Sequence, residues 1–175
     1  MDVINVEKLI TNDYNLKEED VTEVVKRVKL LIINNKNEIL LGYSNNEYQC
    51  PGGHVEDKES LVNAINRELR EETGIELNIK EISPFLYSVG YYKDWPEKGK
   101  NRKVEIYYYE IKTDEKPNLN NTEYTLSEKE GNFELRSVPL ESVEEVFTNN
   151  ANKYGDKHGI AKEMIKVFKI YKSLC

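Results

Sequence analysis

Short runs of apolar and β-branched residues in the first third of the chain predict strands joined by turns. Residues 27–33 form one such run, residues 34–37 a polar turn, and residues 38–43 a second run that pairs with the first as a hairpin. Residues 48–50 then lead into Pro51-Gly52-Gly53, where the glycines permit backbone angles that other residues avoid. The pattern therefore predicts a hairpin followed by a glycine turn.

The rest of the chain mixes strand and helix periodicities. Residues 81–92, 103–112 and 133–138 predict further strands, and residues 160–171, with apolar positions three and four apart, predict a C-terminal helix. For residues 16–25, a short helix and the lead-in to a strand both remain open. Elements in this irregular order predict an α+β fold or an αβα sandwich rather than a regular βαβ array.

A helix is also predicted over residues 60–73, because its apolar residues recur three and four positions apart and Gly74 stands where a C-cap glycine belongs. At about 100° per residue, one side of this helix is polar. The residues on that side, expected to be solvated, are Asn63, Asn66, Arg67 and Arg70.

Three acidic residues of this helix fall on its inward side instead. Glu68, Glu71 and Glu72 share the arc of the apolar residues Leu61, Ala64 and Ile65. Burying unpaired carboxylates side by side is costly and raises their pKa values, whereas a bound divalent cation removes both problems. Carboxylate oxygens suit Mg²⁺, which commonly binds through one or two carboxylates plus substrate phosphates. The alternative is an exposed acidic helix end with Arg67 and Arg70 as partners.

Composition narrows the class of protein. The chain has 175 residues, 38% hydrophobic and 33% charged, with a net charge of −7 and two cysteines. This is typical of one globular domain in a reducing cytoplasm, and residues 1–5 lack the features of a signal peptide. No apolar run is long enough to span a membrane. The negative charge disfavours nucleic acid as a partner, so an anionic substrate requires a local positive charge.

The segment from Gly53 to Ile75 resembles the signature of the Nudix hydrolase family. It contains, at the spacing of the complete Nudix box, Gly53, Glu59, Arg67-Glu68-Leu69, Glu71-Glu72 and Gly74-Ile75. Seven fixed identities and two apolar positions in register are not plausibly accidental, given the background frequencies of the residues. Tyr48 stands where many members carry tryptophan, which is a mild departure.

The resemblance implies a Nudix-like αβα sandwich, with a mixed sheet between helices, in a single domain over residues 1–175. Residues 1–25 would be an N-terminal extension, about 26–150 the core, and about 157–173 the C-terminal helix. The implied activity is Mg²⁺-dependent hydrolysis of a diphosphate linkage in a nucleotide or a nucleoside-diphosphate-linked metabolite, with Mn²⁺ as an alternative ion. A non-catalytic, nucleotide-sensing module and an isoprenoid diphosphate isomerase are the alternatives, and the intact box counts against both.

The resemblance also assigns roles within the box. Glu68, Glu71 and Glu72 would hold the metal, with the Gly53 carbonyl as a further ligand. Arg67 would orient the carboxylates, and Glu59 would contribute to the helix start and the metal shell, although a surface salt bridge explains either residue equally well. The general base would be Glu68, or else Glu128 or Glu130 from a later loop.

Residues outside the box are the candidates for substrate binding. Tyr91 and Tyr92 lie at a distance from the box where family members that hydrolyse dinucleoside polyphosphates carry a stacking tyrosine, although coincidence is the favoured alternative in a chain with 12 tyrosines. Trp95 precedes the basic segment that includes Lys100 and Arg102, so the indole could stack on a base while the loop meets phosphates. A plain solvated hairpin loop is the alternative. The expected partner is a small nucleotide-type molecule, and association into a homodimer stays open.

Overall fold

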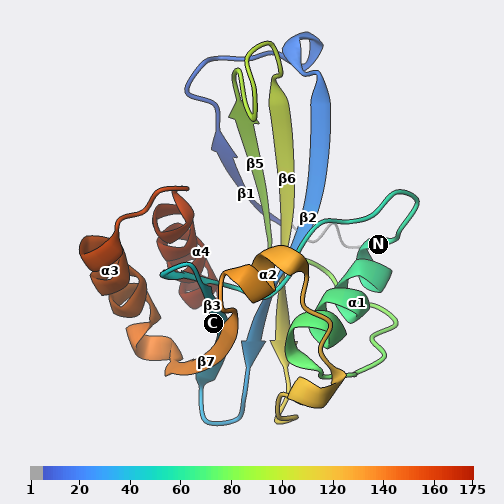
Figure 1. Ribbon diagram of the computed structural model, residues 1–175, viewed down its shortest axis with the longest axis vertical. Helices are drawn as coiled ribbons and strands as arrows, with labels where there is room; N and C mark the ends of the chain where they lie inside the picture. Colours follow the sequence, from blue (N-terminus) through green and yellow to red (C-terminus); the bar gives the residue numbers. More distant parts are fainter. Residues whose placement is uncertain (1–5) are drawn as a thin grey trace.

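Strand β2 (Glu23–Ile33) runs through the middle of the sheet shown in Figure 1. The computed structural model describes residues 6–175, so the residues on which the signal-peptide prediction rests lie outside it. In this part of the chain the sheet has seven strands in the order β1-β5-β6-β2-β3-β4, and β7 also pairs with β3. β2 pairs in parallel with β6 (Arg102–Lys112) and antiparallel with β3 (Glu38–Ser44), so the sheet is mixed. The other strands are β1 (Glu7–Thr11), β4 (Glu47–Gln49), β5 (Leu86–Tyr92) and β7 (Glu134–Pro139).

Helices cover both faces of this sheet (Figure 1). Helix α1 (Leu61–Thr73) lies on one face, and α3 (Val143–Tyr154) and α4 (Ile160–Leu174) lie together on the other. The short helix α2 (Leu126–Glu130) belongs to the connection between β6 and β7. Three 3-10 turns complete the elements: Glu18–Asp20, Leu119–Asn121 and Leu140–Ser142. The predicted αβα sandwich with a mixed sheet is confirmed.

The alternation of side chains along β2 explains the two cores. Val28, Leu30 and Ile32 point to one face, where they pack with Ala64, Ile65 and Leu69 of α1. Leu31 and Ile33 point to the other face and pack with residues of α3 and α4, namely Val143, Phe147, Met164, Val167, Phe168 and Tyr171. Since consecutive residues of a strand face opposite sides, an unbroken apolar run is what a strand buried on both faces requires.

Most elements predicted from the pattern are present at nearly the predicted positions. The hairpin, the box helix, the strands at 103–112 and 133–138 and the C-terminal helix are all confirmed. The strand predicted from residue 81 begins only at Leu86, because Pro84 has no N–H group for a ladder and Asn66 of α1 holds Ile79 through both backbone groups. The open segment at 16–25 contains a 3-10 turn followed by the start of β2. Within residues 6–175 no helix has the length and apolar character needed to cross a membrane.

Candidate active site

The glycine turn of the box lies against β2 and is fixed there by backbone hydrogen bonds. The N–H groups of Leu30 and Val28 donate to the carbonyls of Pro51 and Gly53, at 2.9 and 3.0 Å. Gly52 has a φ of 131°, and a Cβ at this position would collide with the Val28 carbonyl. Only glycine combines this backbone angle with so close an approach, so the turn presents its remaining backbone groups toward α1.

A half-buried lysine of β2, Lys29, also holds this turn. The Lys29 ammonium donates to the carbonyls of Cys50 and Gly52 at 2.9 and 3.1 Å, and to the side chain of Gln49 at 3.4 Å. Lys29 is not among the residues predicted from the sequence, although a lysine between Val28 and Leu30 in an apolar strand is a signal that could have found it. Lys29 therefore brings a positive charge under the glycine turn.

Both ends of α1 are fixed by local chemistry. The Ser60 hydroxyl caps the first turn by accepting from the N–H of Asn63 at 3.1 Å. At the other end Gly74 adopts a left-handed conformation with a φ of 72°, and its N–H donates to the Arg70 carbonyl. A side chain at Gly74 would collide with the Asn118 carbonyl, so this glycine is also where the β6–β7 connection meets the helix. These contacts set the position of the box carboxylates relative to the turn.

Two of the three predicted carboxylates are buried. Glu72 is 4% exposed and accepts a hydrogen bond from the Gly52 N–H at 3.0 Å. Burial raises the pKa of Glu72 to about 8, against the lowering effect of Lys29. Glu68 is 7% exposed, and burial also raises its pKa, opposed by Arg67. Gly53 makes room for Glu68, because a Cβ there would lie 2.5 Å from its Oε1.

Arg67 forms hydrogen bonds with three acids of the box, Glu59, Glu68 and Glu71. Its guanidinium donates to Glu59 at 2.8 and 2.9 Å, to Glu68 at 2.8 Å and to Glu71 at 3.2 Å, and it also bonds the His54 carbonyl. The bonds from Arg67 lower the pKa of Glu59. The helical wheel placed Arg67 on the solvated side, and that expectation is wrong. Its long side chain folds back along the helix to reach the carboxylates, as arginine stems often do.

The other residues expected on the solvated side differ in their exposure. Asn63 is exposed, whereas Asn66 and Arg70 are half-buried. Asn66 is held by the backbone of Ile79, and Arg70 pairs with Glu123 at 2.9 Å. The connection after α1 thus covers Asn66, whereas Arg70 keeps a third of its side chain exposed.

The acids of the box therefore form two groups. Glu68 and Glu72 are buried against the glycine turn, whereas Glu71 is half-buried and directed at arginines. Among residues 6–175, no three histidine, cysteine, aspartate or glutamate side chains lie close enough together to hold a metal ion as they stand. Of the acids in the later loop, Glu128 acts electrostatically on Glu72 and raises its pKa, whereas Glu130 is exposed.

A cavity of about 420 Å³ lies on the face of β2 that points away from α1, between β5, β6 and the start of α4. Trp95 and Arg102 line it, with the guanidinium 4.7 Å from the indole centre, and the ring of Tyr92 lies 6.0 Å from that of Trp95. Tyr91 instead points away and bonds Glu18 at 2.6 Å, and Lys100 pairs with Glu97 at 2.7 Å. Of the four predicted substrate residues, the cavity thus brings together Trp95 and Arg102 but neither Tyr91 nor Lys100.

The lining of this cavity is rich in positive charge. Besides Arg102 it contains Arg27, Lys29 and Lys157, and Glu163 is its one acidic side chain. Arg27 bonds the ring of His54, the residue after the glycine turn, at 3.1 Å. The Nε atom of Arg27 is buried without a hydrogen-bond partner among the described residues. Arg27 therefore connects the cavity with the box and has bonding capacity left for an anion.

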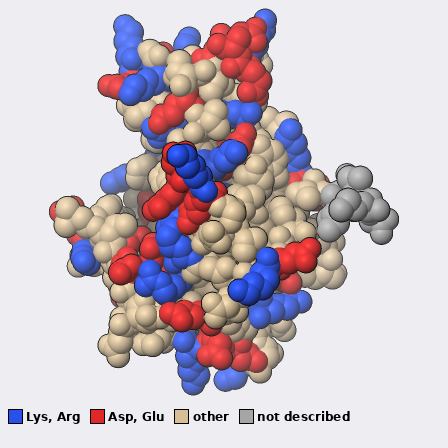
Figure 2. Space-filling model, turned by 90° about the vertical axis from the view of Figure 1, so that its right-hand side faces the viewer, with Lys and Arg blue, Asp and Glu red and all other residues tan. Residues whose placement is uncertain are grey.

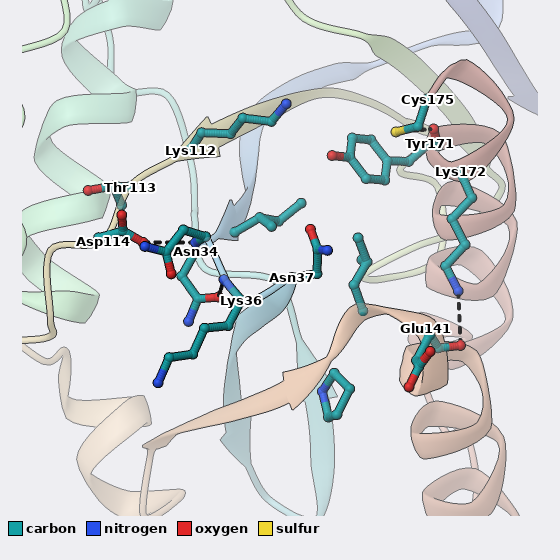
Figure 3. A pocket seen from close by; sticks show the side chains of 14 residues that line it. Asn34, Lys36, Asn37, Lys112, Thr113, Asp114, Glu141, Tyr171, Lys172 and Cys175 are labelled. Atoms are coloured by element: carbon teal, nitrogen blue, oxygen red, sulfur yellow. Dashed lines mark hydrogen bonds between the residues drawn. The ribbon is translucent and has the colours of Figure 1, made fainter.

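Two other parts of the surface are the face on the side of α1 and a hollow at the far end of the sheet. On the face seen from the side of α1, acidic and basic side chains are interspersed rather than gathered by sign (Figure 2). A larger hollow of about 1020 Å³ lies at the far end of the sheet, around the turn at residues 34–37 and the end of α4. Figure 3 shows its lysines and asparagines spread around the hollow, and Lys172 donates to the backbone carbonyl of Glu141 at 3.2 Å. No residue of the box lines that hollow.

Comparison with known proteins connects this geometry to a family. A model of the NUDIX domain matches residues 25–158. Three similar solved structures are a MutT protein from Methanosarcina mazei Go1 (21% identity, 86% of this chain and 96% of that one, TM-score 0.54), a MutT protein from Bacillus halodurans (20%, 69% and 72%, 0.52) and an Ap4A hydrolase from C. elegans (21%, 86% and 96%, 0.51). At these identities the likeness concerns the fold. No curated protein matches the chain in sequence.

Proposed function

Because the chain belongs to the Nudix family, and is thus a hydrolase acting on phosphoanhydride bonds, we propose that it is a Mg²⁺-dependent pyrophosphohydrolase. Its substrate would be a nucleotide or a nucleoside-diphosphate-linked metabolite. The observation that carries this proposal is the burial of Glu68 and Glu72 beside the glycine turn. Ordinary acidic surface helices keep such residues in water.

The donor set fits a hard divalent cation. Glu68, Glu71, Glu72 and the Gly53 carbonyl would hold it, and Mn²⁺ could replace Mg²⁺ because both ions prefer oxygen ligands. Burial raises the pKa values of Glu68 and Glu72, so a nearby cation would remove an existing electrostatic cost. When bound, the metal would neutralise the diphosphate and lower the pKa of an attacking water.

The remaining box residues would act by holding these carboxylates. Arg67 connects Glu59, Glu68 and Glu71, so it would fix their orientation, and Glu59 would hold Arg67 in turn. We propose Glu68 as the general base. Glu128, whose charge already acts on Glu72, is the alternative, and the exposed Glu130 is the less favourable one.

The nucleoside part of the substrate would occupy the cavity lined by Trp95 and Arg102. We call it the cavity beside the box, because Arg27 of its lining contacts His54 of the box. Trp95 and Tyr92 provide aromatic faces for stacking, and Arg102 and Arg27 provide charge for phosphates. Lys100 would contribute only if the β5–β6 loop rearranged, and Tyr91, which is fixed in β5, only if it left Glu18. The local positive charge supplies what a chain of net charge −7 otherwise lacks.

A panel assay tests the proposed function. Release of phosphate or nucleoside monophosphate is measured with NTPs, ADP-ribose, NADH, nucleotide sugars and dinucleoside polyphosphates, with Mg²⁺, with Mn²⁺ and with EDTA. We expect metal-dependent hydrolysis of at least one compound, lowered by orders of magnitude in Glu72→Gln. Glu145→Gln, on the exposed side of α3, is the matched control. Near wild-type rates in Glu72→Gln would contradict the metal assignment, and a silent panel would favour a ligand-sensing module.

Two further tests concern the organisation of the chain. We propose that residues 1–175 form a single Nudix domain, which would unfold in one transition in calorimetry. Association into a homodimer stays open, and light scattering after size-exclusion chromatography distinguishes it from a monomer.

A further inference from the structure

Glu163 stands out among the residues that line the cavity beside the box. It lies in the first turn of α4, and the other charged side chains of the lining are cationic. It also lies beyond residues 25–158, the segment that the family model matches. Its presence is therefore not explained by the features that define the family.

The two oxygens of the Glu163 carboxylate have different surroundings. Oε1 accepts hydrogen bonds from the hydroxyls of Tyr108 at 2.7 Å and Ser88 at 3.2 Å. Burial beside Glu163 raises the pKa of the Tyr108 hydroxyl, which therefore remains a donor. Oε2 receives no hydrogen bond from residues 6–175, and it is not among their buried unpartnered atoms. The carboxylate is thus held through Oε1, whereas Oε2 stays without a hydrogen bond in a side chain that lines this cavity and also the hollow between β1, β5 and α4.

The charges of the cavity decide which part of a nucleotide can meet this oxygen. Phosphates are repelled by a carboxylate and are attracted to Arg27, which also contacts His54 of the box. The aromatic rings of Tyr92 and Trp95 attract the flat face of a base. A base stacked there presents its edge to the cavity wall, and an ionised carboxylate accepts only from donors. Amino groups of adenine or cytosine are such donors.

We infer that Glu163 is a specificity-determining residue whose Oε2 accepts a hydrogen bond from an amino group on the edge of the substrate base. The inference rests on the proposed function and deepens it, since it names the class of substrate as nucleotides with amino-bearing bases. A base without an amino group at this edge would leave Oε2 unpaired on binding, which is unfavourable when the site is closed to water.

Fluorescence of the single tryptophan tests the inference without catalysis. Trp95 is the only tryptophan of the chain and lines the cavity, so a stacked base should quench its emission. In metal-free buffer the wild-type protein is titrated with AMP and CMP and with the two monophosphates that lack only the amino group, those of purine riboside and zebularine. We expect each natural nucleotide to bind about tenfold more tightly than its analogue, as a hydrogen bond to a charged group allows.

The Glu163→Gln variant makes the test specific. Its side-chain oxygen can still accept from Tyr108 and Ser88, so its NH₂ group would turn to the cavity and present donors where Oε2 presented an acceptor. The ratio of affinities between nucleotide and analogue should then fall to about one or invert. Glu145→Gln on α3 is the matched control and should keep the wild-type ratio.

Each outcome bears on the inference. Equal affinities in the wild-type protein, a ratio that Glu163→Gln leaves unchanged, or no response of Trp95 to any nucleotide would overturn it. A contact to the ribose would instead give different affinities for AMP and dAMP. AMP and its analogue without the amino group would then bind equally tightly. If the hydrolysis panel is silent while the ratio is as expected, the proposed activity fails and the base contact of Glu163 stands. Hydrolysis without the expected ratio would support the proposed activity and overturn the base contact.

Discussion

Replacing Glu72 with glutamine should change how the stability of the metal-free protein depends on pH. Burial raises the pKa of Glu72 from an ordinary value of 4.5 to about 8 in the folded protein. Between these two values the folded state binds one more proton at this site than the unfolded state does. The free energy of unfolding must therefore fall as the pH rises through this window, and the contribution is complete only below pH 4.5.

The size of this effect follows from the two pKa values. One proton changes the free energy of unfolding by about 1.4 kcal/mol per pH unit. Between pH 5 and pH 8 the wild-type protein should thus lose about 3 to 4 kcal/mol through Glu72 alone. Glutamine has nearly the same shape and can still accept from the Gly52 N–H, but it does not titrate. Glu72→Gln should therefore gain that amount relative to wild type across the same window.

Urea unfolding in EDTA at a series of pH values measures this difference. Subtracting the wild-type curve from that of Glu72→Gln cancels the shared groups that do not interact with Glu72, so the difference reports Glu72 together with its coupling to Glu68. Glu145→Gln, exposed on α3, should track the wild type throughout. Added Mg²⁺ at pH 8 should stabilise the wild type and not Glu72→Gln. Parallel curves for wild type and Glu72→Gln would refute the reasoning, because a solvated carboxylate has nothing to gain from becoming an amide.

Three other substitutions test contacts of the site. Gly53→Ala places a methyl group 2.5 Å from the present position of Glu68 Oε1, so kcat should fall at least about tenfold, as for misplaced catalytic groups, and unchanged rates would contradict the close approach. Lys29→Met removes the bonds to the Cys50 and Gly52 carbonyls and should cost about 2 kcal/mol in urea unfolding; an unchanged midpoint would show that water replaces the ammonium. Trp95→Leu should raise KM about tenfold and leave kcat nearly unchanged, since stacking contributes about 1 to 3 kcal/mol per base; a loss confined to kcat would place the base elsewhere.

The sequence was sufficient for the box helix because two independent signals agree there. The spacing of its apolar residues and the position of Gly74 specify the same C-terminal boundary, and the structure adds the Ser60 cap at the other end. Helix α3 was not predicted, because its apolar residues Val143 and Phe147 stand among polar neighbours and gain their meaning only by packing against α4. Strand β1 is likewise short and mostly exposed, so its pairing with β5 leaves little periodic trace in the sequence.

The site shows the same division between local and long-range information. The inward position of Glu68 and Glu72 follows from helical geometry, which is local. The contacts of Arg67 with the carboxylates depend on its side-chain conformation, which the helical wheel does not give. The contacts of Lys29 with the turn join residues about twenty positions apart. Pairing of β2 with β6 brings Arg102 near Glu23, and α4 brings Glu163 to the same cavity. The periodicity of a single segment does not predict contacts between segments that lie far apart in the sequence.

The distribution of cations around the box indicates where a further positive charge would be most stabilising. Arg67 forms ion pairs with Glu59, Glu68 and Glu71, so one guanidinium offsets part of the negative charge of three carboxylates. Glu72 forms no ion pair with residues 6–175, and it has only the field of Lys29, whose ammonium is already bound to backbone carbonyls. Glu72 is therefore the carboxyl with the least cationic compensation, and burial keeps it protonated below about pH 8. A divalent ion beside Glu72 would replace that proton and meet a carboxylate that no arginine contacts and little water screens, whereas Arg67 and Arg70 already contact Glu71.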